Sequence, residues 1–211
     1  MKIERYDYLG TSLIIPIAES YHDCLELIRS DRFRQLGKKE NGIAIVFKSI
    51  WQTIFPTHSH GLPVLFWLRL SQYKGWLWLF CRWMYAVISR NALVDIPIRT
   101  KIGYGFYIGH GMGMVINGGT IIGNNVNLSH FVSIGTNNNT PSIIGDNVYV
   151  GPNVSIVEDV RIGKNATIGA GAVVTKDVPE KGTAVGVPAH IVNNKGNKPV
   201  NPYPFTAAIQ D

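Results

Sequence analysis

Residues 143–176 read IIGDNVYVGPNVSIVEDVRIGKNATIGAGAVVTK, and in this stretch an aliphatic side chain returns every six residues. The positions that keep this period are Ile144, Val150, Ile156, Ile162, Ile168 and Val174. A period of six does not match the repeat of an α-helix. It matches a coil with short flat sides, in which each side carries one inward aliphatic residue and ends in a corner rich in Gly or Asn.

Three such sides close a triangular turn of about 18 residues, and successive turns stack as parallel strands about 4.8 Å apart. The same period occurs in two earlier runs, Ile96, Ile102 and Ile108, then Ile116, Ile122, Leu128 and Ile134. We therefore predict a mostly β fold, a parallel β-helix of about five coils between Val94 and Val192. A generic glycine-rich β domain would need all thirteen positions to fall in phase by chance.

Two breaks in the period mark loops. The step from Ile108 to Ile116 is eight residues, and the step from Ile134 to Ile144 is ten. The extra residues must leave the coil, because otherwise the following aliphatic side chains would face outward. The two loops are residues 109–113 (GHGMG) and 136–141 (TNNNTP). Loops on a rigid solenoid are where functional residues are most often placed.

The chain divides into three parts by pattern. Residues 1–92 show helical spacing of apolar residues over 17–37 and 43–55, and we expect a small α-helical N-terminal region. Residues 93–192 carry the six-residue repeat and are expected to form the β-helix. Residues 193–211 are rich in Asn, Lys and Pro and are expected to form an extended tail.

Residues 62–89 form the most apolar stretch of the N-terminal region. Arg69, Lys74 and Arg82 divide it into pieces shorter than the ~18 apolar residues that a membrane span needs. We predict two amphipathic helices joined near Lys74 and Gly75, packed on the coil or on another subunit. Peripheral attachment of 62–89 to a membrane through its tryptophans and basic residues is the alternative.

Composition and charge limit the classes of partner. The chain has 211 residues, of which 45% are hydrophobic and only 16% charged, so we expect copies of the chain to cover part of its surface. The net charge of +6 favours anionic partners such as phosphorylated cofactors or a membrane face. We expect no nucleic-acid partner, since Lys and Arg are not interleaved with aromatic residues in any run.

Cysteine and histidine spacing gives further expectations. Cys24 and Cys81 lack metal-ligand spacing and follow no secretory signal, so we expect a protein of the reducing cytoplasm, which could work at the inner face of the membrane. His58 and His60 form a His-x-His pair without a third candidate ligand nearby, so we expect no metal site.

The residues most suited to chemistry lie near the first loop. His110 follows Ile108 by two residues, and Asp95 precedes Ile96, which should lie one coil below Ile116. A carboxylate one coil from an imidazole could bond one ring nitrogen and leave the other free as a base. A surface His beside a surface Asp is the plainer alternative. Since Leu128 should stack on Ile108, His130 should stand above His110, either as a second contact to substrate or as an ordinary corner residue.

Several motifs carry a resemblance to a known family. They are VDI (94–96), KIG (101–103), HGMGMVI (110–116), IGAGAVV (168–174) and GVPA (186–189). With these motifs the chain from about Val94 to Val192 resembles the hexapeptide-repeat acyltransferases, most closely the serine acetyltransferase-like branch. The resemblance implies a left-handed β-helix, a homotrimer that could pair into a dimer of trimers, and acetyl-CoA as acetyl donor. It also implies His110 as general base and Asp95, 15 residues earlier, as the residue that orients it.

The resemblance also implies where acetyl-CoA binds, in a groove between coils. The matching positions are Gly135, Thr136, Gly151, Pro152, Ala170, Thr175 and Lys176. Lys176 is the candidate for the nucleotide phosphates, because a charge-assisted contact to phosphate is strong. Each of these positions could equally be an ordinary corner of the coil.

Two departures from the family pattern concern the acceptor. Gly109 stands where serine acetyltransferases carry an acidic residue before the catalytic His, and the loop 136–141 is shorter than their Gly-rich loop. We therefore take Gly109, His130 and Asn138 as acceptor-binding candidates and favour O-acetylation of a sugar hydroxyl in surface-polysaccharide synthesis. A weaker likeness of residues 66–69 (FWLR) to enzymes of that kind agrees. Serine O-acetylation and a non-catalytic scaffold are the alternatives.

Overall fold

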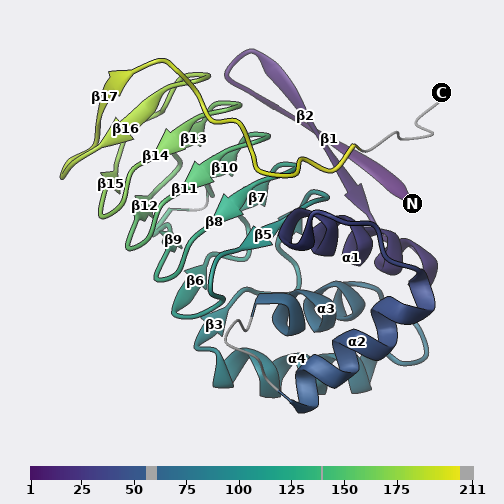
Figure 1. Cartoon of the computed structure of the whole chain (residues 1–211). Helices are drawn as coiled ribbons and strands as arrows, with labels where there is room; N and C mark the ends of the chain where they lie inside the picture. Colours follow the sequence, from purple (N-terminus) through teal and green to yellow (C-terminus); the bar gives the residue numbers. More distant parts are fainter. Residues whose placement is uncertain (56–60, 139, 205–211) are drawn as a thin grey trace.

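The computed structural model describes residues 1–55, 61–138 and 140–204, and the chain forms a hairpin, four helices and a β-helix in that order (Figure 1). The hairpin pairs β1 (Lys2–Tyr8) with β2 (Thr11–Ile17). The helices in the described ranges are α1 (Tyr21–Leu36), α2 (Gly42–Ile54), α3 (Gly61–Gln72) and α4 (Trp78–Asn91). None of these helices combines the length and the apolarity needed to cross a membrane.

The β-helix has three faces of stacked short strands. The β3 face contains β3 (Val94–Asp95), β6 (Met114–Ile116), β9 (Ser133–Gly135), β12 (Ser155–Val157) and β15 (Val173–Val174). The β4 face contains β4 (Lys101–Ile102), β7 (Ile121–Ile122), β10 (Ile143–Ile144) and β13 (Arg161–Ile162). The β5 face contains β5 (Tyr107–Ile108), β8 (Asn127–Leu128), β11 (Tyr149–Val150), β14 (Thr167–Ile168), β16 (Thr183–Val185) and β17 (His190–Asn193). All these strand pairs are parallel except β16 with β17.

The thirteen aliphatic residues that the six-residue period selects all lie in the core of the β-helix. Each of them is at most 2% exposed. The register places Leu128 on Ile108 and Ile134 on Ile116, so the two longer steps do leave the coil as loops. The predicted left-handed parallel β-helix, with mostly β content after the N-terminal helices, is confirmed.

Asparagines close one corner of every coil in the middle of the β-helix. Asn125, Asn147 and Asn165 have φ angles between 53° and 60°, a left-handed conformation that Asn tolerates better than most side chains. The side-chain amide of Asn147 also donates a hydrogen bond to the side-chain oxygen of Asn165 at 3.0 Å. These corners fix the turn between the β4 and β5 faces.

A buried ion pair joins the helices to the first coil. The Arg69 side chain, 1% exposed, donates to Asp31 at 2.8 Å and to the carbonyl oxygen of Ile102 at 2.8 Å. Asp31 also accepts from the backbone amide of Phe106 at 2.7 Å. Asp31 lies on α1 and Arg69 on α3, so this network fixes both helices to the base of the β-helix.

The predicted helices are present, and the N-terminal region also contains a hairpin that the sequence pattern did not predict. Residues 2–17 form the hairpin, and α1 starts only at Tyr21, after the capping residue Ser20. Residues Tyr8, Leu13 and Ile15 pack with Ile143 in a separate buried cluster. Since side chains along a strand point alternately to its two sides, β2 turns Leu13 and Ile15 toward the β4 face and covers it with apolar side chains.

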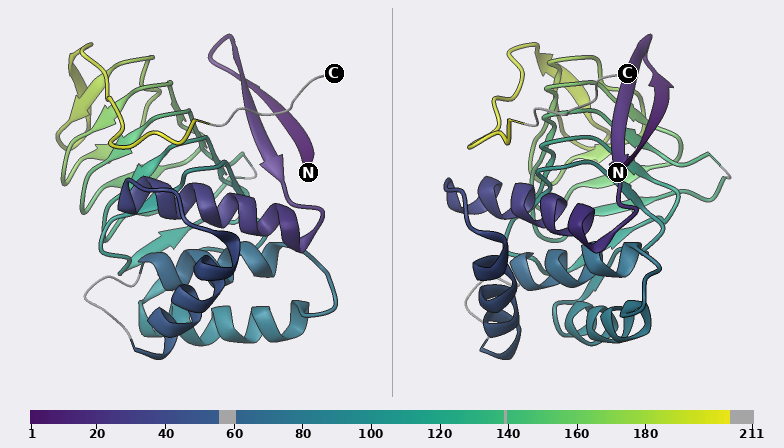
Figure 2. Two further views of the ribbon diagram at one scale, coloured as in Figure 1. Left: turned by 45° about the vertical axis from the view of Figure 1, so that its right-hand side comes forward. Right: turned by 90° about the vertical axis from the view of Figure 1, so that its right-hand side faces the viewer.

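The C-terminal tail crosses the β5 face. After β17 it runs back along the coils toward α1, opposite the hairpin in the right-hand view of Figure 2. The backbone amide of Asn197 donates a hydrogen bond to the carbonyl oxygen of Asn165 at 2.6 Å. The backbone amide of Tyr203 donates one to the side-chain oxygen of Asn125 at 2.9 Å. β17 ends at Asn193, and the described residues after it, 194–204, form no further helix or strand.

Candidate functional site

The loop that carries His110 is held at both ends. The Gly109 amide donates to the carbonyl oxygen of Leu128 at 2.8 Å, and the Gly113 amide donates to that of Ala92 at 3.2 Å. Gly113 has φ 66°, and the Phe131 ring occupies the space that a Cβ would need. His110 itself has φ 61° and an exposed side chain. The backbone thus presents the imidazole to solvent from a fixed position.

His130 stands beside His110, as the stacking of Leu128 on Ile108 predicts. The centroids of the two imidazole rings are 5.3 Å apart, with an angle of 82° between the ring planes. His130 is half-buried, and its Nδ1 is buried without a hydrogen-bond partner among the described atoms. Two imidazoles at one corner can bind and deprotonate a hydroxyl.

Asp95 lies one coil below, at the expected register. It pairs with Val115 of the next coil and is exposed. The hydrogen bonds of the described residues include none between Asp95 and His110, so its orienting role stays a prediction. The Tyr85 hydroxyl, which sequence reasoning missed, donates to the carbonyl oxygen of Ile96 at 2.6 Å and fixes α4 against β3. Burial raises the pKa of Tyr85, and the nearby Asp95 charge adds to this.

The site faces the side of the β-helix that is open to solvent. The hairpin covers the β4 face and the tail crosses the β5 face, whereas the outward residues Asp95, Val115 and Ser133 of the β3 face are exposed. His110 lies where the chain enters this face from β5. The β3 face is therefore the surface on which a substrate or another copy of the chain can lie.

The predicted acetyl-CoA positions fall in two columns along the edges of the β3 face. Gly151, Pro152 and Ala170 follow strands of the β5 face in the same column as His110 and His130. The remaining members, at the opposite edge, are Gly135, Thr136, Thr175 and Lys176. A Cβ at Gly151 would lie 2.8 Å from the Ala170 amide nitrogen, so coil stacking by itself requires glycine there.

Asn138 does not lie with the histidines. Its loop leaves the end of β9, whereas His110 precedes β6, and a strand of this length separates the two edges by about 10 Å. The side-chain amide of Asn138 donates a hydrogen bond to Oε2 of Glu158 at 2.9 Å, and the Thr136 hydroxyl donates one to the same oxygen at 3.2 Å. Sequence reasoning missed Glu158, although it follows the core residue Ile156 by two, the same offset as His110 from Ile108.

Lys176 borders a cavity at the last coils. The cavity has a volume of about 520 Å³ and is also lined by Thr175, Pro188 and His190. Thr175 and Lys176 are exposed there. The ammonium group is thus available to an anionic ligand.

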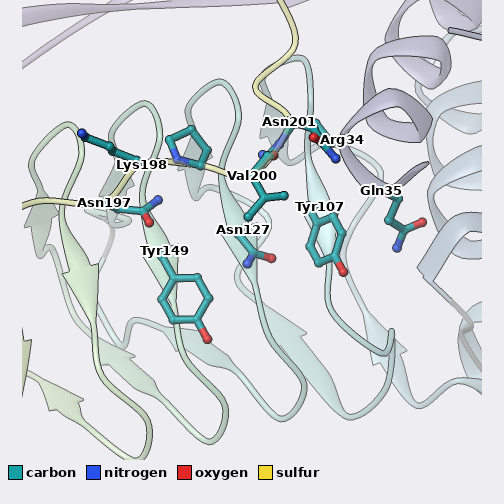
Figure 3. Close-up of a pocket in the computed structure, with 10 residues that line it drawn as sticks. Arg34, Gln35, Tyr107, Asn127, Tyr149, Asn197, Lys198, Val200 and Asn201 are labelled. Carbon is teal, nitrogen blue, oxygen red and sulfur yellow. The ribbon is translucent and has the colours of Figure 1, made fainter. Parts of the chain in front are cut away.

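A second cavity, which the sequence did not predict, lies between the β5 face and the tail (Figure 3). It has a volume of about 430 Å³, and Asn127 lies between Tyr107 and Tyr149 on its floor. The Asn127 side-chain oxygen is buried and lacks a partner among the described atoms. None of the residues predicted to hold acetyl-CoA lines this cavity.

The described residues contain no cluster of three or more His, Cys, Asp or Glu side chains that could hold a metal ion. His58 and His60 lie outside the described residues. Cys24 and Cys81 are buried free thiols, and burial raises the pKa of Cys24 to about 12. A thiol in this state stays protonated and does not act as a nucleophile at neutral pH.

Comparisons with known proteins agree with the fold and the repeats. Residues 141–176 match the family model described as bacterial transferase hexapeptide (six repeats). A serine acetyltransferase of Buchnera aphidicola is 36% identical over 63% of this chain and 54% of its own length. One of Bacillus pumilus is 35% identical over 65% of this chain and 66% of its own.

A solved structure titled as a serine acetyltransferase in complex with CoA is 27% identical, with a TM-score of 0.61 over 81% of this chain and 68% of that one. The chain spans between half and two thirds of the first two relatives. Residues 141–176 of its β-helix carry the hexapeptide repeat, and the chain is similar in sequence to these serine acetyltransferases.

Proposed function

We propose that this chain is an acetyl-CoA-dependent O-acetyltransferase with His110 as its general base. The observation that carries the proposal is His110, fixed on a glycine-rich loop beside His130 at the edge of the open face of a hexapeptide β-helix. The CoA complex of a homologue supports acetyl-CoA as the donor.

The reaction follows from these groups. His110 takes the proton of the acceptor hydroxyl while the hydroxyl oxygen attacks the thioester carbonyl carbon. The carbon–sulfur bond then breaks, CoA leaves as its thiolate, and the imidazolium returns the proton to that sulfur. Direct transfer is consistent with the buried thiols of Cys24 and Cys81, which are not placed to form an acyl-enzyme. In this proposal Asp95 orients His110, and His130 contacts the acceptor oxygen.

L-serine is the acceptor that the comparisons favour, because the two relatives described above are named serine acetyltransferases. The first expectation, a sugar hydroxyl in surface-polysaccharide synthesis, has no support among them. Serine, the alternative in the sequence analysis, therefore becomes the leading acceptor.

A sugar hydroxyl remains the second candidate on one specific observation. Gly109 offers no carboxylate to a serine ammonium group beside His110. A neutral acceptor would fit this corner without a charged partner.

The acceptor is tested by mixing the protein with acetyl-CoA and following free thiol. We expect saturable thiol release with L-serine and formation of O-acetylserine by mass spectrometry. Thiol release with nucleotide sugars but not with L-serine would make a sugar hydroxyl the acceptor. No release with either, together with no acetyl-CoA binding by calorimetry, would leave the scaffold alternative.

The placement of acetyl-CoA is tested at Lys176. Lys176→Ala is expected to raise KM for acetyl-CoA by about 10- to 100-fold and to leave KM for the acceptor nearly unchanged, because a charge-assisted contact to phosphate contributes about 1.5–3 kcal/mol. The matched control is Lys195→Ala, another exposed lysine, which should change neither constant. An increase confined to the acceptor KM would refute the placement.

The assembly belongs to the same proposal. A homotrimer would cover the exposed β3 face and place a neighbouring coil against each His110 loop. Its site would then be shared between subunits, and two trimers could pair.

A further inference from the structure

The end of the molecule formed by α2 and α4 exposes an unusual number of large apolar side chains. Trp51 is 62% exposed on α2, Trp83 is 60% exposed on α4, and Trp76 is 85% exposed just before α4. The other exposed members are Ile43, Phe47, Ile50, Ile54, Phe55, Leu79, Phe80 and Val87. We name this set the helical patch. Patches of this extent on soluble proteins mark surfaces that bind something.

The two halves of the helical patch meet over α3. The Trp67 indole nitrogen donates to the Thr53 hydroxyl of α2 at 2.9 Å, and its ring lies 5.8 Å from that of Phe80 on α4. The views in Figures 1 and 2 agree that α2 and α4 lie at the end of the molecule away from β17. All five tryptophans of the chain fall between residues 51 and 83.

The chain segment that forms the helical patch carries basic residues and no acidic ones. Residues 41–94 contain five basic residues and no acidic residue. Lys48 pairs with Glu40 at 2.6 Å, whereas the exposed Lys74 and Arg82 lie over the Trp78 ring, at 5.9 and 5.3 Å from its centroid. The ion pairs of the described residues include neither Lys74, Arg82 nor Arg90.

We propose that the helical patch docks the protein on the surface of an anionic lipid membrane. Exposed tryptophans and leucines suit the level of the lipid headgroups, and unpaired cations beside them complement anionic lipids. A second copy of the chain fits less well, because a symmetric contact would place the basic residues of both copies together without acidic partners.

Docking would also set the position of His110. Helix α4 ends at Asn91, and the next residue, Ala92, accepts the hydrogen bond that holds the His110 loop. Leu93, 72% exposed, lies between α4 and β3. The loop would therefore sit beside the membrane, whatever hydroxyl it acts on.

The test is co-sedimentation with vesicles in low salt, with tryptophan emission as a second readout. We expect binding and a blue shift with phosphatidylcholine vesicles that contain phosphatidylglycerol, and weak binding to phosphatidylcholine alone. Lys74→Gln/Arg82→Gln should lower the partition coefficient about 25-fold, roughly fivefold per cation. Trp51→Ser/Trp83→Ser should abolish binding.

The controls are Val192→Ser and Lys195→Gln, which remove an exposed apolar and an exposed basic side chain outside the patch and should bind like the parent chain. Circular dichroism checks that each variant is folded. Absence of binding to anionic vesicles, or equal binding to both vesicle types, would overturn the proposal. Light scattering gives a further outcome. If the parent chain forms an oligomer that Trp51→Ser/Trp83→Ser dissociates, and does not bind vesicles, the helical patch would be a contact between two copies of the chain.

Discussion

His110→Ala is expected to lower kcat for acetyl transfer by about 10²–10⁴, because the acceptor hydroxyl loses the base that removes its proton. This corresponds to about 3–5 kcal/mol of transition-state stabilisation. Since the His110 side chain is exposed, the variant should unfold at the same urea concentration as the parent chain. Free-thiol release under saturating acetyl-CoA and acceptor measures the effect.

A second variant distinguishes the two imidazoles. His130→Ala removes the neighbouring ring, 5.3 Å from His110, and should raise KM for the acceptor more than it lowers kcat if His130 contacts the acceptor. Parental turnover by His110→Ala would remove His110 from the mechanism. A large kcat loss in His130→Ala alone would make His130 the base.

The β-helix and the position of His110 could be predicted because the six-residue repeat is a local signal. Each aliphatic residue of the repeat specifies its own coil, so Leu128 falls on Ile108 and His130 on His110 without knowledge of any distant contact. The loops follow by counting, since extra residues cannot remain in a coil whose core residues must point inward.

What the sequence did not predict depends on segments far apart in the chain. The hairpin is placed by Tyr8, whose hydroxyl approaches Gly145, and the tail by Tyr203, which bonds Asn125. The cavity in Figure 3 exists because this tail lies over the β5 face. No repeat encodes such pairings, and each side chain on its own resembles an ordinary surface residue.

Arg69 is the clearest example of a residue with a local and a distant role. In the sequence it interrupts an apolar stretch and argues against a membrane span. In the structure it is buried, and its partner Asp31 lies 38 residues earlier on another helix. The spacing of apolar residues around Arg69 correctly predicted helix α3. The ion pair with Asp31 is visible only in the packing of α1 against α3.

Asp31→Ala is expected to lower the free energy of unfolding by about 3–5 kcal/mol, since it leaves the charge of Arg69 buried without a counterion. Arg69 is 1% exposed and donates two hydrogen bonds to this carboxylate, at 2.8 and 3.1 Å. The backbone amide of Phe106 would also lose its acceptor. The measurement is the midpoint and slope of urea unfolding followed by circular dichroism.

The exposed pair of Glu180 and Lys181, with side chains 51% and 58% exposed, is the matched control. Glu180→Ala should cost less than about 1 kcal/mol, because solvent screens an exposed pair. The double variant Asp31→Leu/Arg69→Met should recover much of the stability, since apolar replacement of both partners removes the uncompensated charge. If Asp31→Ala unfolded at the parental urea concentration, the ion pair would contribute nothing to fixing α1 and α3. The hydrogen bonds that Arg69 donates to the carbonyl oxygens of Ile102 and Gly103 would then suffice to hold α3 against the first coil.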